Sequence, residues 1–265
     1  MSTSPELAST TPLLPLARRT TGVRNLVRKE MGQWWTTRTW WIHLILWIVV
    51  LDVVSALVVR DPDLTAADAL AEAIRTFLLM CAAAVAVGVV VTVQGAVVGE
   101  KELGTAAWVI SKPVSRRSFI TAKLVAHVTG FLVTAVVVPA LGFILVAQTA
   151  DVPSIDLGRF AAGVAVVALA VSFYVVLTLA LGVLFTGRGP IAGIGVGLVL
   201  TGLFFRGMLP TALVVATPWP LGDVAASLAL GTDLDFTWYV PVLINVATGA
   251  ALLTIALWRF EREEL

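Results

Sequence analysis

Six long apolar runs dominate the hydrophobic pattern of this chain, and shorter polar stretches separate them. The runs cover residues 40–59, 74–98, 119–147, 159–185, 190–205 and 238–258. A helix needs about 20 apolar residues to cross a hydrocarbon layer about 30 Å thick. The runs are continuous and do not alternate between polar and apolar residues, which excludes the strands of a membrane β-barrel. The pattern therefore predicts an all-α polytopic membrane protein with six transmembrane helices.

The segments outside the runs differ in character. Residues 1–20 are rich in Ser, Thr and Pro, which predicts a disordered cytoplasmic tail. Residues 21–38 place apolar side chains on one helical face and cations on the other, which predicts an amphipathic interface helix; the alternative is an ordinary basic flank. Residues 209–230 contain two half-length apolar segments around the breaker TPWPLGD, which predicts a re-entrant outer hairpin before the sixth span.

The charged segment 99–117 lies between the second and third apolar runs. Within it, ELGTAAWVIS has the pattern of a short amphipathic helix. Pro113 is expected to end that helix, because the residue before a proline is pushed out of the α conformation. Ser115 is then placed to cap the helix that begins the third span. We expect a compact coupling helix that transmits force between two spans; the alternative is a charged connector without a partner.

The distribution of cations predicts the orientation of the chain. Six spans put both termini on one side of the membrane, and that side would hold fourteen of the 18 Lys and Arg residues. Loops rich in Lys and Arg stay in the cytoplasm. Both termini and segment 99–117 are therefore expected to be cytoplasmic. The net charge is only +1, which gives no indication of a nucleic-acid partner.

A few residues within the runs are candidates for function or assembly. Asp52 is an acid well inside an apolar run, which marks a functional candidate by default; the alternative is an acid that faces a water-filled interface near the outer end. Gln94 and Asn245 join it as candidates for a translocation path. Gly189, Gly193 and Gly197 recur every four residues, a spacing that lets a second helix approach closely. That second helix belongs either to another subunit or to the same one.

Several kinds of catalytic and binding motif are missing. The chain has no GxxxxGK[ST] phosphate loop and no GxSxG elbow. Its two histidines and one cysteine do not make a zinc site. The apolar runs also lack the paired charges that ion-driven transporters usually need. We therefore expect no enzymatic activity and no bound cofactor, and energy that comes from outside the chain.

The charged segments resemble the membrane subunits of ABC-2 type transporters. The resemblance rests on the pattern E-K-E-x-G-T, then P-V-S-R, then a lysine before an apolar helix. In this chain the pattern comprises Glu100, Lys101, Glu102, Gly104, Thr105, Pro113, Val114, Ser115, Arg116 and Lys123. The run of Arg28, Lys29 and Glu30 before the first span is similar to the interface helix of that family. The hairpin at 209–230 is similar to its re-entrant outer segment.

The resemblance implies the permease subunit of an exporter in a bacterial cell membrane. It implies two copies of a separate ATP-binding subunit, which carry ATP and Mg²⁺, and a second permease copy or paralogue. It also implies that the first, second and fifth spans approach the subunit interface. The residues expected to couple to the ATPase are Glu100, Glu102, Gly104, Thr105, Trp108, Pro113 and Arg116.

The substrate is expected to be hydrophobic or amphipathic, because the path is apolar and weakly charged. Two other classes of function remain open. One is a membrane scaffold that recruits a soluble partner. The other is a six-span intramembrane enzyme or carrier, which would need an acid and a histidine at one depth. Asp52 and His127 are expected near opposite membrane faces, which argues against that class.

Overall fold

The computed structural model describes residues 22–105 and 114–263, and these form helices joined by loops, without a strand. The predicted tail at 1–20 and the candidates Trp108 and Pro113 lie outside the described residues. The described elements, in chain order, are α1 (Val23–Trp35), α2 (Thr39–Trp47), η1 (Ile48–Val53), α3 (Val54–Val58), α4 (Ala66–Val93), α5 (Val98–Glu102), α7 (Arg116–Phe131), η2 (Leu132–Val137), α8 (Val138–Gln148), α9 (Leu157–Leu184), α10 (Arg188–Phe205), η3 (Arg206–Met208), α11 (Thr211–Val215), α12 (Leu221–Leu230) and α13 (Tyr239–Glu261). Here η1 and η2 are π-helical and η3 is a 3-10 helix.

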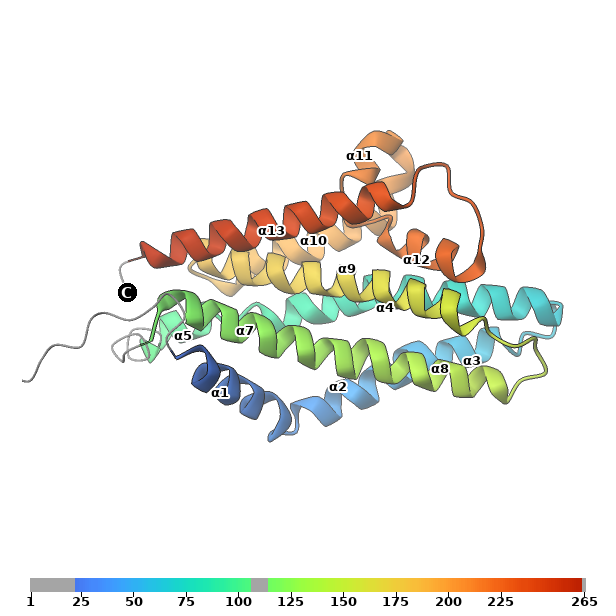
Figure 1. Ribbon diagram of the computed structural model, residues 1–265, viewed down its shortest axis with the longest axis horizontal. Coiled ribbons are helices and arrows are strands. Elements are labelled where there is room, and N and C mark those ends of the chain that lie inside the picture. Colours follow the sequence, from blue (N-terminus) through green and yellow to red (C-terminus); the bar gives the residue numbers. More distant parts are fainter. Residues whose placement is uncertain (1–21, 106–113, 264–265) are drawn as a thin grey trace, which may run out of the picture.

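Six helical segments among the described residues are long and apolar enough to cross a membrane, so the predicted six-span, all-α fold is confirmed. They are Thr39–Val58, Ala66–Glu102, Arg116–Gln148, Leu157–Leu184, Arg188–Met208 and Tyr239–Glu261. They run roughly along the long axis of the molecule (Figure 1). The second segment begins before residue 74, because the Thr65 hydroxyl accepts a hydrogen bond from the Asp68 amide and caps the helix there.

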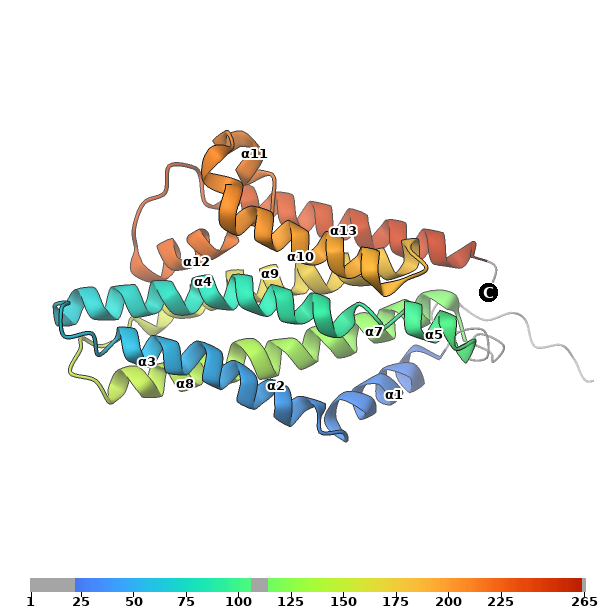
Figure 2. The same cartoon turned by 180° about the vertical axis from the view of Figure 1, so that it is seen from behind.

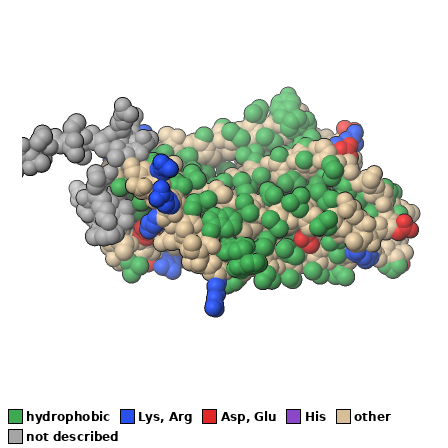
Figure 3. All heavy atoms as spheres, turned by 60° about the horizontal axis from the view of Figure 1, so that its bottom comes forward, with side chains coloured by type: hydrophobic (Ala, Val, Ile, Leu, Met, Phe, Trp, Pro, Cys, Tyr) green, Lys and Arg blue, Asp and Glu red, His purple; other side chains and the backbone are tan. Residues whose placement is uncertain are grey.

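The two ends of the bundle carry different features. One end holds α5, the start of α7 and the end of α13, and we call it the α5 end (Figure 1). The opposite end holds the loops α3–α4 and α8–α9. Figure 3 shows a broad band of hydrophobic side chains between the two ends, with Lys and Arg side chains gathered at the α5 end. This arrangement is that of a membrane-spanning bundle with one cationic end.

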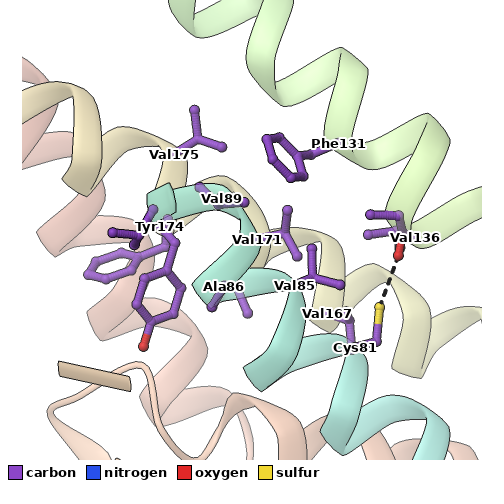
Figure 4. Packing of buried hydrophobic residues seen from close by; sticks show 14 of the residues in the cluster. Cys81, Val85, Ala86, Val89, Phe131, Val136, Val167, Val171, Tyr174 and Val175 are labelled. Atoms are coloured by element: carbon purple, nitrogen blue, oxygen red, sulfur yellow. Dashed lines mark hydrogen bonds between the residues drawn. The ribbon is translucent and has the colours of Figure 1, made fainter. Parts of the chain in front are cut away.

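The second, third and fourth spans form the centre of the bundle. Their residues contribute most of the buried core, including Val85, Phe131 and Val171 (Figure 4). The first, fifth and sixth spans bury only a small share of their residues inside the chain. Seen from behind, α4 lies between α2–α3 on one side and α10 with α12 on the other (Figure 2). The peripheral spans therefore present apolar faces to lipid or to another subunit.

Pro139 follows the π-helix η2 and leaves a carbonyl without its helical partner beside the only cysteine. A proline has no N–H to donate to the carbonyl four residues earlier, and its ring crowds that carbonyl. The turn before Pro139 is the π-helix η2, and the carbonyl of Ala135 accepts a hydrogen bond from the Cys81 thiol at 3.4 Å instead (Figure 4). Cys81 is fully buried, so its role here is to pair a carbonyl inside the bundle.

The amphipathic N-terminal segment and the apolar hairpin both pack onto the bundle. Helix α1 buries Leu26, Glu30 and Trp34, which follow one another at intervals of four residues, and it packs along α7. The segment predicted as a re-entrant hairpin forms α11 and α12, and α12 packs on α4 and α9. At about 1.5 Å per residue, α12 is about 15 Å long and too short to cross a membrane.

Candidate functional site

The connection between α5 and the residues that follow begins with a tight turn. Gly104 has a φ of 68°, a left-handed conformation that favours glycine, and its amide donates to the Lys101 carbonyl at 3.0 Å. The Thr105 hydroxyl donates to the Glu100 carbonyl at 3.1 Å. The Leu103 side chain is 77% exposed although it is apolar. The turn therefore ends α5 and presents an apolar side chain at the surface.

Four charged side chains connect α5 to α1 and α7, and we call them the Lys123 cluster: Lys29, Glu30, Glu100 and Lys123. The Lys123 ammonium lies 2.7 Å from a Glu100 oxygen and 3.3 Å from a Glu30 oxygen. The Lys29 ammonium lies 3.2 Å from Glu30 and 3.6 Å from Glu100. The cluster contains two cations and two anions, so its charges balance. It joins the start of the charged segment to the N-terminal helix and to the third span.

The two lysines of this cluster differ in exposure. The Lys123 side chain is 3% exposed, whereas that of Lys29 is 41% exposed. Burial acts to lower the pKa of Lys29, but attraction to Glu30 and Glu100 outweighs it and raises the pKa above its usual value. Lys29 is therefore charged at neutral pH. Removing one partner of a buried ion pair destabilises the folded protein strongly, because it leaves a buried charge without compensation.

A second group of contacts holds the C-terminal end of α13 against the same segment. Arg116 donates to the carbonyls of Phe260, Glu261 and Glu263, and these hydrogen bonds cap the C-terminal end of α13. Arg117 forms a two-pronged ion pair with the Glu261 carboxylate. The rings of Phe119 and Phe260 stack 5.3 Å apart beneath these contacts. These contacts link the start of the third span to the end of the sixth.

Lys101 adds a third connection from α5. Its ammonium lies 2.8 Å from a Glu263 oxygen and also donates to the Val183 carbonyl at 3.0 Å, near the end of α9. Glu102 faces outward, and its half-exposed carboxylate lies 3.7 Å from the Arg188 guanidinium. The α5 end therefore combines a buried set of ion pairs with an exposed edge.

The predicted coupling residues separate into two groups in this arrangement. Glu100 and Arg116 contact other parts of the same chain, whereas Glu102, Gly104 and Thr105 are exposed. In the predicted interface helix, Arg28 is exposed and Lys29 and Glu30 belong to the Lys123 cluster. The residues Trp108 and Pro113 lie outside the described range, as stated above.

The three candidates for a translocation path lie in separate surroundings. Asp52 is 4% exposed and packs against Gly142 of α8, where an added Cβ would meet its carboxylate. The Gln94 amide donates to the Val91 carbonyl of its own helix. The Asn245 amide donates to the carbonyls of Thr217 and Pro241 at 2.9 and 2.8 Å, so it ties α13 to the hairpin segment. The structure does not bring these three side chains together.

The glycines of α10 face in two directions. An added Cβ at Gly189, Gly193 or Gly197 would meet nothing within 4 Å. At Gly195 and Gly202 it would collide with Val90 and Trp219 of the same chain. The repeating row therefore lies on the open side of α10, and the other two glycines serve packing within the chain.

Sequence reasoning did not select several residues that build this region. Lys123 was noted only as the end of a pattern, and the acids Glu261 and Glu263 only as part of a polar tail. Two signals pointed to them: the Arg116–Arg117 pair needs carboxylates, and the tail RFEREEL offers them. The burial of Lys123 has no comparable signal, because it depends on how α1 packs against α7.

The fold defines a multi-pass helical membrane protein in which ion pairs join several helices at the α5 end. The chain matches the family described as ABC-2 family transporter protein over residues 24–265, and it belongs to that family. It is therefore a transporter membrane component, a class that is generally not catalytic itself and that associates with an ABC ATP-binding subunit. No match was found among curated proteins.

Proposed function

We propose that this chain is the permease subunit of an ABC exporter in a bacterial plasma membrane. The α5 end and both termini face the cytoplasm, and the substrate is hydrophobic or amphipathic. Two copies of a separate subunit bind ATP and Mg²⁺ and dock at the α5 end. The observation that carries this proposal is the family membership, together with the ion pairs that join α5 to α1, α7 and α13.

These connections offer a route for force. A subunit that displaces the segment between the second and third spans would pull on α1 through Glu30 and on α7 through Lys123. The same displacement would reach α13 through Lys101 and Arg116. Because the contacts are short and partly buried, they resist stretching more than exposed pairs do.

We assign the contact surface to the exposed edge of this end. Glu102, Leu103 and Thr105 are exposed and offer an acid, an apolar side chain and a hydroxyl to a partner. Trp108 and Pro113, which the resemblance also assigns to coupling, lie outside the described residues. Glu100 and Arg116 act differently in this proposal, because they position the edge through contacts inside the chain.

Co-purification with a candidate ATP-binding subunit tests the docking surface. Leu103→Asp combined with Glu102→Arg is expected to reduce the amount of bound ATPase at least tenfold without lowering the thermal stability of the permease. Asp63→Arg is the matched control, since Asp63 is exposed at the opposite end of the bundle. Retention of the ATPase by the double variant at the level of the control would refute this docking surface.

We also propose that two permease subunits meet along α10. The open row of Gly189, Gly193 and Gly197 allows close approach of a second copy or a paralogue. Gly193→Leu is expected to reduce the dimer fraction several-fold in native mass spectrometry. Gly207→Leu is the control, because Gly207 is equally open but lies outside the row. Equal dimer fractions in the two variants would rule out this interface.

A further inference from the structure

A hollow of about 390 Å³ lies beside the Lys123 cluster, between α1, α4, α5 and α7. Its polar lining includes Trp34, Thr92, Glu100, Lys123, His127 and Arg188. The rest of the wall is glycine or apolar and consists of Gly95, Ala96, Gly99, Leu103 and Ala126. The hollow therefore offers charged and hydrogen-bonding side chains set among apolar walls.

Three residues that line the hollow each carry a buried polar atom without a hydrogen-bond partner among the described residues. These atoms are Nε1 of Trp34, Nδ1 of His127 and Oε2 of Glu100, and the Trp34 side chain is only 5% exposed. An indole nitrogen is a donor only, and an ionised carboxylate is an acceptor only. Leaving such groups buried and unpaired destabilises the protein. An occupant that presents an acceptor to Trp34 and a donor to Glu100 would pair both groups.

The lengths of the spans place the hollow at the depth of lipid headgroups. Arg60 donates to the Thr149 hydroxyl at 2.6 Å, so the first and third spans end at the same level at the opposite end. The first span has 20 residues and is about 30 Å long, whereas the third has 33 residues and is about 50 Å long. The third span therefore extends about 20 Å beyond the hydrocarbon layer at the α5 end.

Lys123 and His127 fall on this projecting part, since they lie within the first 12 residues of the span that begins at Arg116. The rings of Trp40 and Trp41 stack 4.0 Å apart at the start of the first span, where an aromatic belt marks the edge of the hydrocarbon. The hollow thus lies between the aromatic belt and the cytoplasmic charges.

The charges around the hollow favour a zwitterion over a simple anion. Glu30 and Glu100 balance Lys123 and Arg188, all of which line it. The Arg188 guanidinium is half-exposed and lies over Gly99, where an added Cβ would come within 3.0 Å of it. Arg188 pairs with Glu102 but stays accessible at the rim, and Oε2 of Glu100 has no hydrogen-bond partner among the described residues.

We propose that this hollow binds the headgroup of a phosphatidylethanolamine-type lipid from the adjacent leaflet. The phosphate oxygens accept from Trp34 and from Arg188, and the primary ammonium donates to the free oxygen of Glu100. A choline headgroup has no N–H to donate, so Glu100 would discriminate against it. The binding goes beyond the transport role, because it joins α1 to the second and third spans whether or not the lipid is cargo.

Lipid binding to the purified chain in detergent tests this inference without an ATPase. Short-chain phosphatidylethanolamine is added, and retained lipid is measured by native mass spectrometry together with the unfolding temperature. We expect phosphatidylethanolamine to bind at least tenfold more tightly than phosphatidylcholine or phosphatidylglycerol of the same chain length. Equal binding of all three would overturn the inference, and so would a preference for phosphatidylglycerol, which would indicate an anion site only.

Two variants separate headgroup recognition from folding. Trp34→Phe keeps an aromatic ring but removes the N–H donor, and Arg188→Gln changes a half-exposed side chain at the rim. Each is expected to weaken binding of phosphatidylethanolamine about tenfold. Arg262→Gln is the control, because Arg262 is an exposed cation at the same end that does not line the hollow. An unchanged lipid preference in both folded variants would refute the assignment.

Discussion

Replacing Lys123 by methionine is expected to destabilise the protein far more than the same change at Lys29. Both ammonium groups contact Glu30 and Glu100, but the Lys123 side chain is 3% exposed and that of Lys29 is 41% exposed. Removing one partner from a buried ion pair costs about 3–5 kcal/mol, because it leaves an uncompensated charge. Lys29 would still lie near both carboxylates, so we expect about 3 kcal/mol, at the lower end of this range.

The measurement is thermal unfolding of the detergent-purified chain, followed by tryptophan fluorescence. For a chain of this size a loss of about 3 kcal/mol lowers Tm by about 6–12 °C. Lys29→Met is the matched control and should cost less than about 1 kcal/mol, as exposed ion pairs do. Adding Glu30→Gln to Lys123→Met should recover part of the loss, since it removes the carboxylate left unpaired. The reasoning is refuted if Lys29→Met lowers Tm as much as Lys123→Met, or if the double variant is less stable than Lys123→Met alone.

Two further predictions concern packing inside the bundle. Cys81→Ala should cost about 1 kcal/mol, because it removes the donor to the carbonyl that Pro139 leaves unpaired, and this cost should shrink in a Pro139→Ala background. A double-mutant cycle of unfolding temperatures checks it, and equal costs in both backgrounds would contradict the pairing. Gly202→Ala should cost about 1–3 kcal/mol, because its Cβ would collide with the Trp219 ring, whereas Gly207→Ala meets nothing and should change stability by less than about 0.5 kcal/mol. Thermal unfolding of the two variants side by side tests this difference.

Long uninterrupted apolar runs were enough to predict the number and type of the spans. Inside the hydrocarbon layer a single segment has few alternatives to a helix, because each backbone N–H and C=O must be paired within the segment. The ends of the spans were predicted less accurately than their number. Span two starts at Ala66, where a Thr65 cap and an alanine-rich turn extend the helix beyond the strongly apolar residues. The family was also recognisable from the sequence, because its charged motif keeps a fixed order along the chain.

The candidate site could be predicted only in part. The sequence located the charged segment between the second and third spans, and it indicated that Glu100 and Arg116 matter there. It gave no indication that these two side chains face inward. That depends on contacts with residues far along the chain, Lys123 and the carbonyls near Glu261, and linear spacing does not encode such distances.

The sequence by itself determined that this chain is a six-span helical membrane protein with one cationic end, because hydrophobic length and charge asymmetry act locally along the chain. Only the tertiary structure decided which charges are buried. Glu102 and Glu100 are two residues apart and chemically alike, yet one is exposed and the other lies beside a buried lysine. The reason is that Lys29 of α1 and Lys123 of α7 approach Glu100, whereas the partner of Glu102 is the half-exposed Arg188.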